Sequence, residues 1–247
     1  MRALIVLGVL LFSNTAVLAA QEACVKHSGA RRAHLVELYT SEGCSSCPPA
    51  DRWLSRIADS AEIIPLGFHV DYWDSSRWHD RFSDARFTAR QRDLAGRSGS
   101  GVVYTPEVAL DGREWQGWSH QPLPAEGPNA FTRLTLHADP GKSLHLSLDV
   151  GGSPDSGARA YFALTQSGLT SRVEGGENRG ATLHHDHVVR AFAGPLPLAH
   201  AAADLALPVD LDRRNANIVA FVQNPASGIV DQVVQLPMSA CEVATVR

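Results

Sequence analysis

The sequence has no excess of positive charge and no low-complexity tract. Its 247 residues include 22 Lys and Arg against 26 Asp and Glu, which gives a formal net charge of -4 at pH 7. An electrostatic nucleic-acid binder shows a basic face, so this balance argues against nucleic acid as a partner. With 44% hydrophobic and 19% charged residues, the composition is that of a globular protein, and the length suggests one large domain or two small ones.

Long hydrophobic runs are missing beyond the first twenty residues. Residues 1–20 combine a short positive start, an apolar stretch and small residues that suit a signal peptidase. The apolar stretch is too short for a comfortable membrane span, and Gln21 and Glu22 follow it without a stop-transfer pattern. We therefore predict a signal peptide over residues 1–20 and a periplasmic or secreted protein that has no membrane anchor after cleavage.

Cysteine is scarce, and its four positions are informative. Cys24 follows the predicted cleavage site and Cys241 lies close to the C-terminus, while Cys44 and Cys47 form a CxxC motif. Disulfides persist in an oxidising compartment. The simplest pairing is a structural disulfide between Cys24 and Cys241 with Cys44–Cys47 as a separate pair, although four cysteines permit three connectivities.

The first half of the chain alternates between strand and helix patterns. Residues 35–39 are predicted to form a strand that leads into the CxxC motif, and an amphipathic helix follows over residues 50–58. Residues 63–70 are typical of a buried central strand, and residues 84–95 of a second helix. Asp111-Gly112 between two β-prone runs predicts a hairpin.

The second half has a different pattern. Residues 119–130 contain three prolines and suggest a linker. Several short segments with period-two alternation then follow, separated by turns that are rich in glycine and proline. This spacing predicts a small antiparallel sandwich, so we expect a β-rich domain over residues 131–241.

The CxxC motif has the residues for thiol–disulfide exchange. A cysteine thiol at a helix N-terminus has a lowered pKa, because the exposed N–H groups and the helix dipole favour the thiolate. Cys44 holds that position and is the predicted attacking thiol, and Cys47 is the predicted resolving thiol. Ser45 and Ser46 could donate hydrogen bonds to the thiolate. Thr105-Pro106 begins a predicted strand, and either a cis peptide bond or a trans proline at a strand start would explain it.

Several segments carry a resemblance to known proteins. Residues 38–47, around the CxxC motif, and residues 105–112 resemble the CxxC segment and the cis-proline hairpin of the thioredoxin fold, closest in style to glutaredoxin. Residues 36–51, 69–74, 87–91 and 175–180 are similar to an uncharacterised family of exported bacterial thioredoxin-like proteins. The family implies the fold and the CxxC motif and supplies no substrate.

The resemblance implies an α/β fold class, with a thioredoxin-like N-terminal domain over residues 24–122 followed by the mostly β, sandwich-like C-terminal domain. It also implies that Tyr104, Thr105 and Pro106 bind an extended substrate. The expected activity is exchange with a protein or low-molecular-weight thiol or disulfide, without a cofactor, and a redox partner protein is a further candidate. The sequence departs from thioredoxin at Leu38, which stands where that fold places a buried acid.

Other interpretations remain open at this stage. The CxxC pair could be a static disulfide in a secreted interaction module, half of a zinc site, or part of a copper-delivery module. Residues 184–187 contain three histidines and an aspartate, and a solvated strand edge explains them better than a metal site. Tyr72 and Trp73 could be core aromatics or form a rim over the CxxC motif, and Glu177 and Asn178 are predicted to lie in a structural turn.

Overall fold

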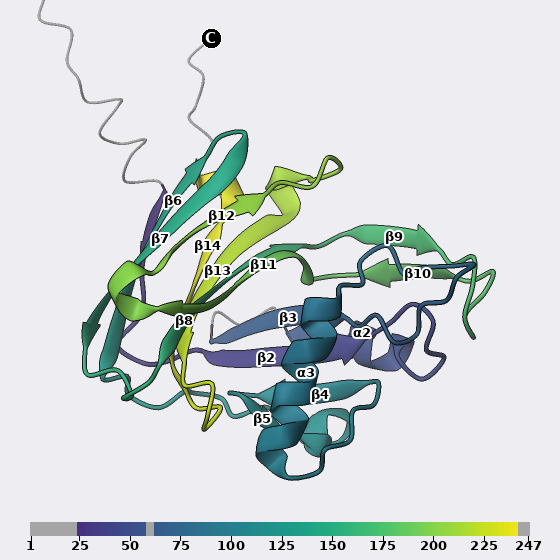
Figure 1. Cartoon of the computed structure of the whole chain (residues 1–247), viewed down its shortest axis with the longest axis horizontal. Helices are drawn as coiled ribbons and strands as arrows, with labels where there is room; N and C mark the ends of the chain where they lie inside the picture. Colours follow the sequence, from purple (N-terminus) through teal and green to yellow (C-terminus); the bar gives the residue numbers. More distant parts are fainter. Residues whose placement is uncertain (1–23, 58–61, 242–247) are drawn as a thin grey trace, which may run out of the picture.

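The computed structural model describes residues 24–57 and 62–241 (Figure 1). The predicted signal peptide over residues 1–20 lies outside the described residues. Within the described ranges, no helix is both long enough and apolar enough to cross a membrane. Two α-helices occur there, α2 (Pro48–Ile57) and α3 (Ala85–Ser98). Short 3-10 helices cover Gln116–Ser119, Leu198–His200, Arg213–Asn215 and Met238–Cys241.

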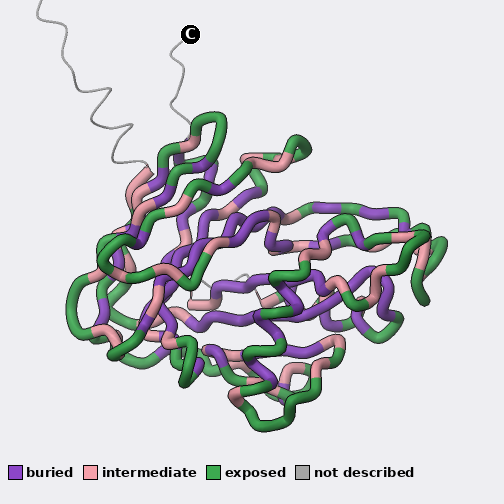
Figure 2. The backbone as a smooth tube through the Cα atoms, in the orientation of Figure 1, coloured by how far each residue is buried: buried purple, intermediate pink, exposed green. Residues whose placement is uncertain are grey.

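An eight-stranded sheet with the order β14-β13-β8-β11-β3-β2-β4-β5 runs through the molecule. The first half of the chain supplies β2 (His34–Thr40), β3 (Ile63–His69), β4 (Glu107–Leu110) and β5 (Arg113–Glu114). The second half supplies β8 (Arg159–Gln166), β11 (Val188–Pro197), β13 (Ala216–Gln223) and β14 (Val230–Pro237). Strand β2 is buried along its whole length and β3 along nearly all of its length, as central strands are (Figure 2).

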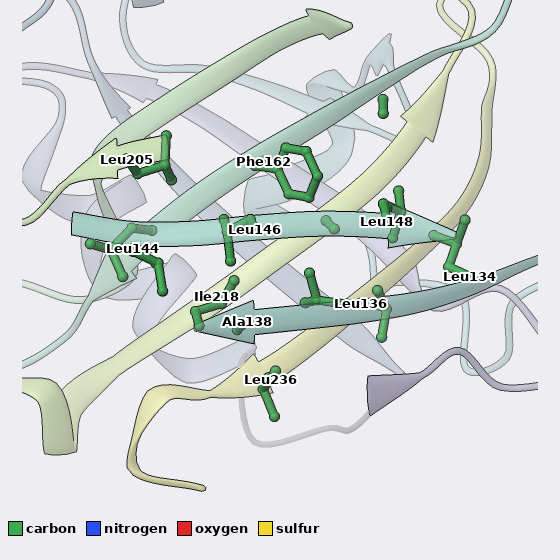
Figure 3. Close-up of a cluster of buried hydrophobic side chains, with 14 of the residues drawn as sticks. Leu134, Leu136, Ala138, Leu144, Leu146, Leu148, Phe162, Leu205, Ile218 and Leu236 are labelled. Carbon is green, nitrogen blue, oxygen red and sulfur yellow. The ribbon is translucent and has the colours of Figure 1, made fainter. Parts of the chain in front are cut away.

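A second sheet of four strands has the order β1-β6-β7-β12. Its strands are β1 (Val25–His27), β6 (Thr132–Pro140), β7 (Ser143–Gly152) and β12 (Ala202–Ala206). Alternate residues of β6 and β7 point inward, and Leu134, Leu136, Leu144 and Leu146 pack against Phe162 and Ile218 of the long sheet (Figure 3). This apolar layer is the core of a β-sandwich in the second half of the chain.

The two helices lie on opposite faces of the long sheet. Val36 and Leu38 of β2 pack with Leu54 of α2, whereas Leu35 and Tyr39 pack in the cluster that contains residues of α3. Successive side chains of a strand point to opposite faces, so this division follows directly from the sequence of β2. Side chains of β8 and β13 alternate in the same way. One set packs against the four-stranded sheet, which lies on the same face of the long sheet as α2. The other set, which includes Tyr161 and Phe221, belongs to the cluster on the α3 face.

The predicted fold class is wrong. The chain is mostly β, and a thioredoxin-like α/β N-terminal domain followed by a sandwich-like C-terminal domain does not describe it. Strands of both halves share one sheet, because β11 pairs with β8 on one side and with β3 on the other. Local periodicity indicates which segments are strands, but it does not indicate that β3 and β11, more than a hundred residues apart, are neighbours.

A buried ion pair lies between β2 and α3. Arg90 donates to both carboxylate oxygens of Glu37, at 2.6 and 2.9 Å, and to the side-chain oxygen of Gln223 at 2.9 Å. Its guanidinium lies 5.2 Å from the ring centroids of both Tyr161 and Phe221. Burial lowers the pKa of Arg90, but the Glu37 carboxylate more than offsets this, so the pKa lies above its ordinary value. The ion pair therefore keeps Arg90 charged and attaches α3 to the sheet.

We predict that Arg90→Met destabilises the protein by about 3–5 kcal/mol, because it leaves the Glu37 carboxylate buried without its partner. The double variant Glu37→Leu/Arg90→Met should recover much of this loss. Arg86→Met is the matched control on the same helix, since Arg86 pairs with Asp84 at an exposed site and such pairs contribute about 0–1 kcal/mol. Urea denaturation measures all three, and equal losses for Arg90→Met and Arg86→Met would contradict the prediction.

Candidate functional site

The CxxC motif lies between the end of β2 and the start of α2, and its two cysteines form a disulfide. The loop is held by its own backbone, since Cys44 N donates to Ser41 O and Cys47 N donates to Cys44 O, both at 3.2 Å. The two cysteine residues are only 1% and 0% exposed. The second disulfide joins Cys24 to Cys241, so both predicted pairings are confirmed. A thiol can therefore reach the Cys44–Cys47 sulfurs only after the surface above them moves.

The Thr105–Pro106 segment lies beside the CxxC loop, and its peptide bond is cis. The hydroxyl of Ser46 donates to Thr105 O at 3.5 Å, and the indole N–H of Trp73 donates to Thr105 Oγ1 at 2.8 Å. The structure thus brings the two sequence-predicted segments together. Tyr104 is 41% exposed and its hydroxyl donates to Glu114 at 2.6 Å, so its side chain is held by the neighbouring strand β5.

The two serines of the motif have different partners. Ser46 Oγ lies 3.3 Å from Cys44 Sγ, so its one hydroxyl hydrogen could turn from Thr105 O to a Cys44 thiolate when the disulfide is reduced. The Ser45 hydroxyl instead donates to Glu177 Oε2 at 2.6 Å, and the Ser45 backbone N–H donates to the same oxygen at 3.1 Å. Ser46 therefore contacts the cysteine sulfur, and Ser45 links the motif to a segment 132 residues away.

That segment is the tip of a hairpin formed by β9 (Leu169–Arg172) and β10 (Thr182–His185), which extends beyond the long sheet toward the CxxC end (Figure 1). We call residues 173–181 the hairpin tip. Besides the contact with Ser45, Glu177 N donates to Gly43 O at 2.9 Å. Asn178 Nδ2 donates to Cys44 O at 2.8 Å and to Glu42 O at 3.0 Å. The predicted structural turn is thus part of the surroundings of the CxxC motif.

Glycines allow the hairpin tip to approach the motif closely. Gly176 has a φ of +68°, and a Cβ there would lie 2.5 Å from the Cα of Gly43. A Cβ on Gly175 would lie 2.4 Å from Cγ of Trp78. The only sequence signal for this contact is the paired glycines at 175 and 176, and a single sequence does not say which backbone they face.

A group of buried polar side chains lies behind the motif. His69 Nδ1 and Asp80 Oδ2 are 2.7 Å apart, and Asp80 Oδ2 also accepts from Glu42 N at 2.8 Å. Burial lowers the pKa of His69, but the Asp80 carboxylate more than reverses this, so the pKa lies above its ordinary value. His185 Nε2 lies 3.3 Å from Glu42 Oε1, and these two side chains are 2% and 3% exposed.

The position of His185 corrects the expectation of a solvated strand edge for residues 184–187. His184 is exposed, whereas His185 is buried against His69, with ring centroids 5.1 Å apart. Across residues 24–57 and 62–241, no group of three or more His, Cys, Asp or Glu side chains has a geometry that could hold a metal ion.

Glu107 follows the cis-proline directly and is 2% exposed. Its carboxylate accepts a hydrogen bond of 2.6 Å from Gln91 Nε2, which also donates to Tyr104 O at 2.7 Å. Burial raises the pKa of Glu107 to about 7, which outweighs the opposite effect of the Gln91 hydrogen bond. Gln91 thus links the backbone of Tyr104, which precedes the cis peptide bond, to the carboxyl group of Glu107, which follows it and titrates near neutral pH.

We predict that Glu107 makes stability fall as pH rises from about 4.5 to about 7. In that window the folded protein keeps a proton that the unfolded chain has lost, so ionisation favours unfolding. Glu107→Gln should therefore be more stable relative to wild type at pH 8 than at pH 4. Glu114→Gln is the control, because hydrogen bonds from Tyr104 and Gln116 lower the pKa of Glu114 and give the opposite sign. Denaturation curves at both pH values measure the difference, and a pH-independent effect of Glu107→Gln would refute the assignment.

We also predict that Gly176→Ala speeds reduction of the Cys44–Cys47 disulfide by dithiothreitol, because the new methyl group pushes the hairpin tip away from Gly43. Gly180→Ala is a matched control: Gly180 has a φ of +88°, and nothing lies within 4 Å of its added Cβ. Both variants carry the strain of a left-handed alanine, so only the clash differs. Equal reduction rates for the two variants would show that the hairpin tip does not shield the disulfide.

Comparison with known proteins gives a family and a fold. A search of the curated proteins found no match. Protein AGR_C_4864 from Agrobacterium tumefaciens has a solved structure that matches with a TM-score of 0.57 and 22% identity, over 82% of this chain and 93% of that chain. HBP35 of Porphyromonas gingivalis matches with a TM-score of 0.60 and 12% identity, over 89% of this chain and 79% of that chain. At these identities the likeness concerns the fold alone. The family model described as "Protein of unknown function (DUF1223)" matches residues 35–223, and the chain belongs to this family.

Proposed function

We propose that the protein is an exported thiol–disulfide oxidoreductase that acts through Cys44 and Cys47. The observation that carries this proposal is the placement of the Cys44–Cys47 pair at the start of α2 with the cis Thr105–Pro106 peptide beside it. In a cysteine pair three residues apart at the start of a helix, the first thiol can attack a substrate and the second lies within reach to resolve the mixed disulfide. The proposal rests on this site and makes no use of the fold class.

The proposed reaction conserves thiols and electrons. In the dithiol form, the Cys44 thiolate attacks one sulfur of a substrate disulfide, which forms a mixed disulfide and releases the first substrate thiolate. Cys47 then attacks Cys44 Sγ, which closes the Cys44–Cys47 disulfide and releases the second thiolate. Two electrons pass from the cysteine pair to the substrate, and both released thiolates take up protons from water. A dithiol reductant regenerates the pair, and the reverse sequence oxidises a substrate dithiol.

The surface beside the motif supports a protein or low-molecular-weight thiol or disulfide as substrate. Tyr72, Val102 and Tyr104, which lie close in sequence to Trp73 and Thr105, are 38%, 62% and 41% exposed. Exposed apolar side chains on the segments that meet the CxxC loop would offer contacts to a substrate chain. Trp73 holds the Thr105 hydroxyl, so the two segments that carry these side chains are joined at the CxxC loop.

One observation favours a second candidate, a structural disulfide without turnover. Cys44 and Cys47 are almost fully buried, and the hairpin tip is hydrogen-bonded across the motif. Inert structural disulfides of exported proteins have reduction potentials below about -300 mV, whereas catalytic pairs lie above that value. Equilibration of the protein with reducing and oxidising buffers separates the two candidates.

We predict that Cys44→Ser abolishes reduction of insulin and oxidation of small thiols, because it removes the attacking sulfur. Cys47→Ser should instead accumulate a mixed disulfide between Cys44 and the substrate, which mass spectrometry detects. The double variant Cys24→Ser/Cys241→Ser removes the other disulfide and is the control, since it should keep the activity at temperatures where it remains folded. Full activity in Cys44→Ser would eliminate the proposed function.

A further inference from the structure

The start of α2 offers unusually few N–H donors. The first N–H groups of an α-helix have no partner within the helix, and they are the groups that stabilise an anion at that end. Here the first two helical residues are Pro48 and Pro49, which have no N–H. The N–H of Cys47 donates to Cys44 O. Stabilisation of a Cys44 thiolate therefore depends on the donors of Ser45 and Ser46.

Glu177 engages both donors of Ser45. Its Oε2 accepts from the Ser45 hydroxyl at 2.6 Å and from the Ser45 N–H at 3.1 Å. These hydrogen bonds hold the pKa of Glu177 below its ordinary value, so the carboxylate is ionised at neutral pH. The hydrogen bond that Cys44 Sγ makes within the described residues is the one with Ser46 Oγ, at 3.3 Å.

The hairpin tip holds this carboxylate in place. Glu177 N donates to Gly43 O at 2.9 Å, so backbone and side chain of the same residue bind on both sides of Cys44. Asn178, the next residue, donates to Cys44 O at 2.8 Å. Gly176, the preceding residue, is in contact with the backbone of Gly43. The negative charge is thus positioned beside the first cysteine by several contacts, although the side chain of Glu177 remains exposed to solvent.

We propose that Glu177 tunes the redox equilibrium of the Cys44–Cys47 pair toward the disulfide, and so makes the dithiol form the stronger electron donor. The carboxylate disfavours the Cys44 thiolate in two ways, by its charge and by its hold on the Ser45 donors. A disulfide carries no charge, so the carboxylate destabilises the reduced form to the extent that Cys44 is ionised there and leaves the oxidised form nearly unaffected. Glu177 is a positioning residue, because it acts through Ser45 and touches no reacting sulfur.

This inference rests on the proposed function only in taking Cys44 as the reacting thiol. It adds a direction, since it assigns the protein to the reducing side of thiol–disulfide exchange. A helix N-terminus with free N–H donors would have the opposite effect. Free donors stabilise the thiolate and therefore the reduced protein, which favours oxidation of substrates.

The test is the equilibrium of the cysteine pair with reduced and oxidised glutathione in wild type, Glu177→Gln and Glu177→Ala. Glutamine keeps an oxygen that can accept from Ser45 but has no charge, and alanine removes both effects. We expect Glu177→Gln to shift the equilibrium toward the dithiol by about threefold to tenfold, where tenfold corresponds to about 30 mV. Glu177→Ala should shift it further, and the thiolate absorbance at 240 nm should appear at lower pH in the same order.

Glu174→Gln is the matched control, because Glu174 is an exposed carboxylate of the same hairpin tip, three residues from Glu177. It should leave both readouts unchanged. High salt is a second control: at about 1 M the Debye length is about 3 Å, so the difference between wild type and Glu177→Gln should shrink. An unchanged equilibrium in Glu177→Gln and Glu177→Ala, or the same shift in Glu174→Gln, overturns the inference.

These outcomes are separate from those that decide the proposed function. The glutathione equilibrium and the thiolate absorbance report on the cysteine pair whether or not it turns over a substrate. If the insulin and small-thiol assays fail but Glu177→Gln gives the expected shift, the proposed enzyme activity is rejected and the effect of Glu177 is kept. If the protein is fully active but the variant gives no shift, the activity is kept and the effect of Glu177 is rejected.

Discussion

The arrangement of the site depends on the pairing of β11 with β3. Val188 pairs with Gly67, and Gly67 N donates to His187 O at 2.8 Å. Strands β8 and β11 continue into β9 and β10 with short breaks at residues 167–168 and 186–187, so the point where β11 meets β3 also sets where the hairpin leaves the sheet. Because β2 is the next strand after β3, the hairpin leaves beside the end of β2, where the CxxC loop begins. One strand contact therefore brings two halves of the chain to one site.

The same contact brings two other elements within van der Waals distance of Gly67 in β3. A Cβ added to Gly67 would lie 3.4 Å from His187 O and 3.6 Å from a methyl group of Leu54 on α2, so the helix and the β11 backbone both approach the strand here. His187 itself has a φ of +57°, which marks the turn of the chain from the hairpin into β11. Close packing on both sides of β3 thus fixes the position of α2, which carries the CxxC motif, relative to the hairpin that covers it.

Local sequence patterns predicted much of the site. The strand before the motif and the helix after it follow from short-range spacing, and the disulfide pairing is the simplest of the three that four cysteines permit. The peptide bond at Thr105-Pro106 is cis, which was one of two explanations that the sequence left open. These features depend on residues that are neighbours in the sequence, or on four cysteines that can pair in only three ways.

The features that the sequence did not reveal all involve distant partners. His185 lies in a segment in which the alternation of residues suggests a solvated strand edge. It is buried, because its ring packs against the rings of His69 and Phe82. Glu177 has the appearance of a turn residue, and its role depends on a contact with Ser45 across 132 positions. The fold class was wrong for the same reason: residues 34–118 contain the strands and helices in the predicted order, but their sheet continues into the second half of the chain.

Carboxylates lie near the CxxC motif both in the core and at the surface. Leu38, which faces α2, is surrounded by Val36, Leu54 and Val108. The carboxylate on that face is Asp51 of α2, which accepts from Thr40 Oγ1 at 2.9 Å and whose pKa is raised by burial. The acid next to Leu38 in sequence, Glu37, points to the opposite face and is neutralised by Arg90. The carboxylate bonded to the CxxC backbone comes instead from the exposed hairpin tip. A charge at such a site is screened by salt and moves with the hairpin, so the proposed effect of Glu177 implies that displacement of residues 173–181 would change the redox equilibrium of the pair.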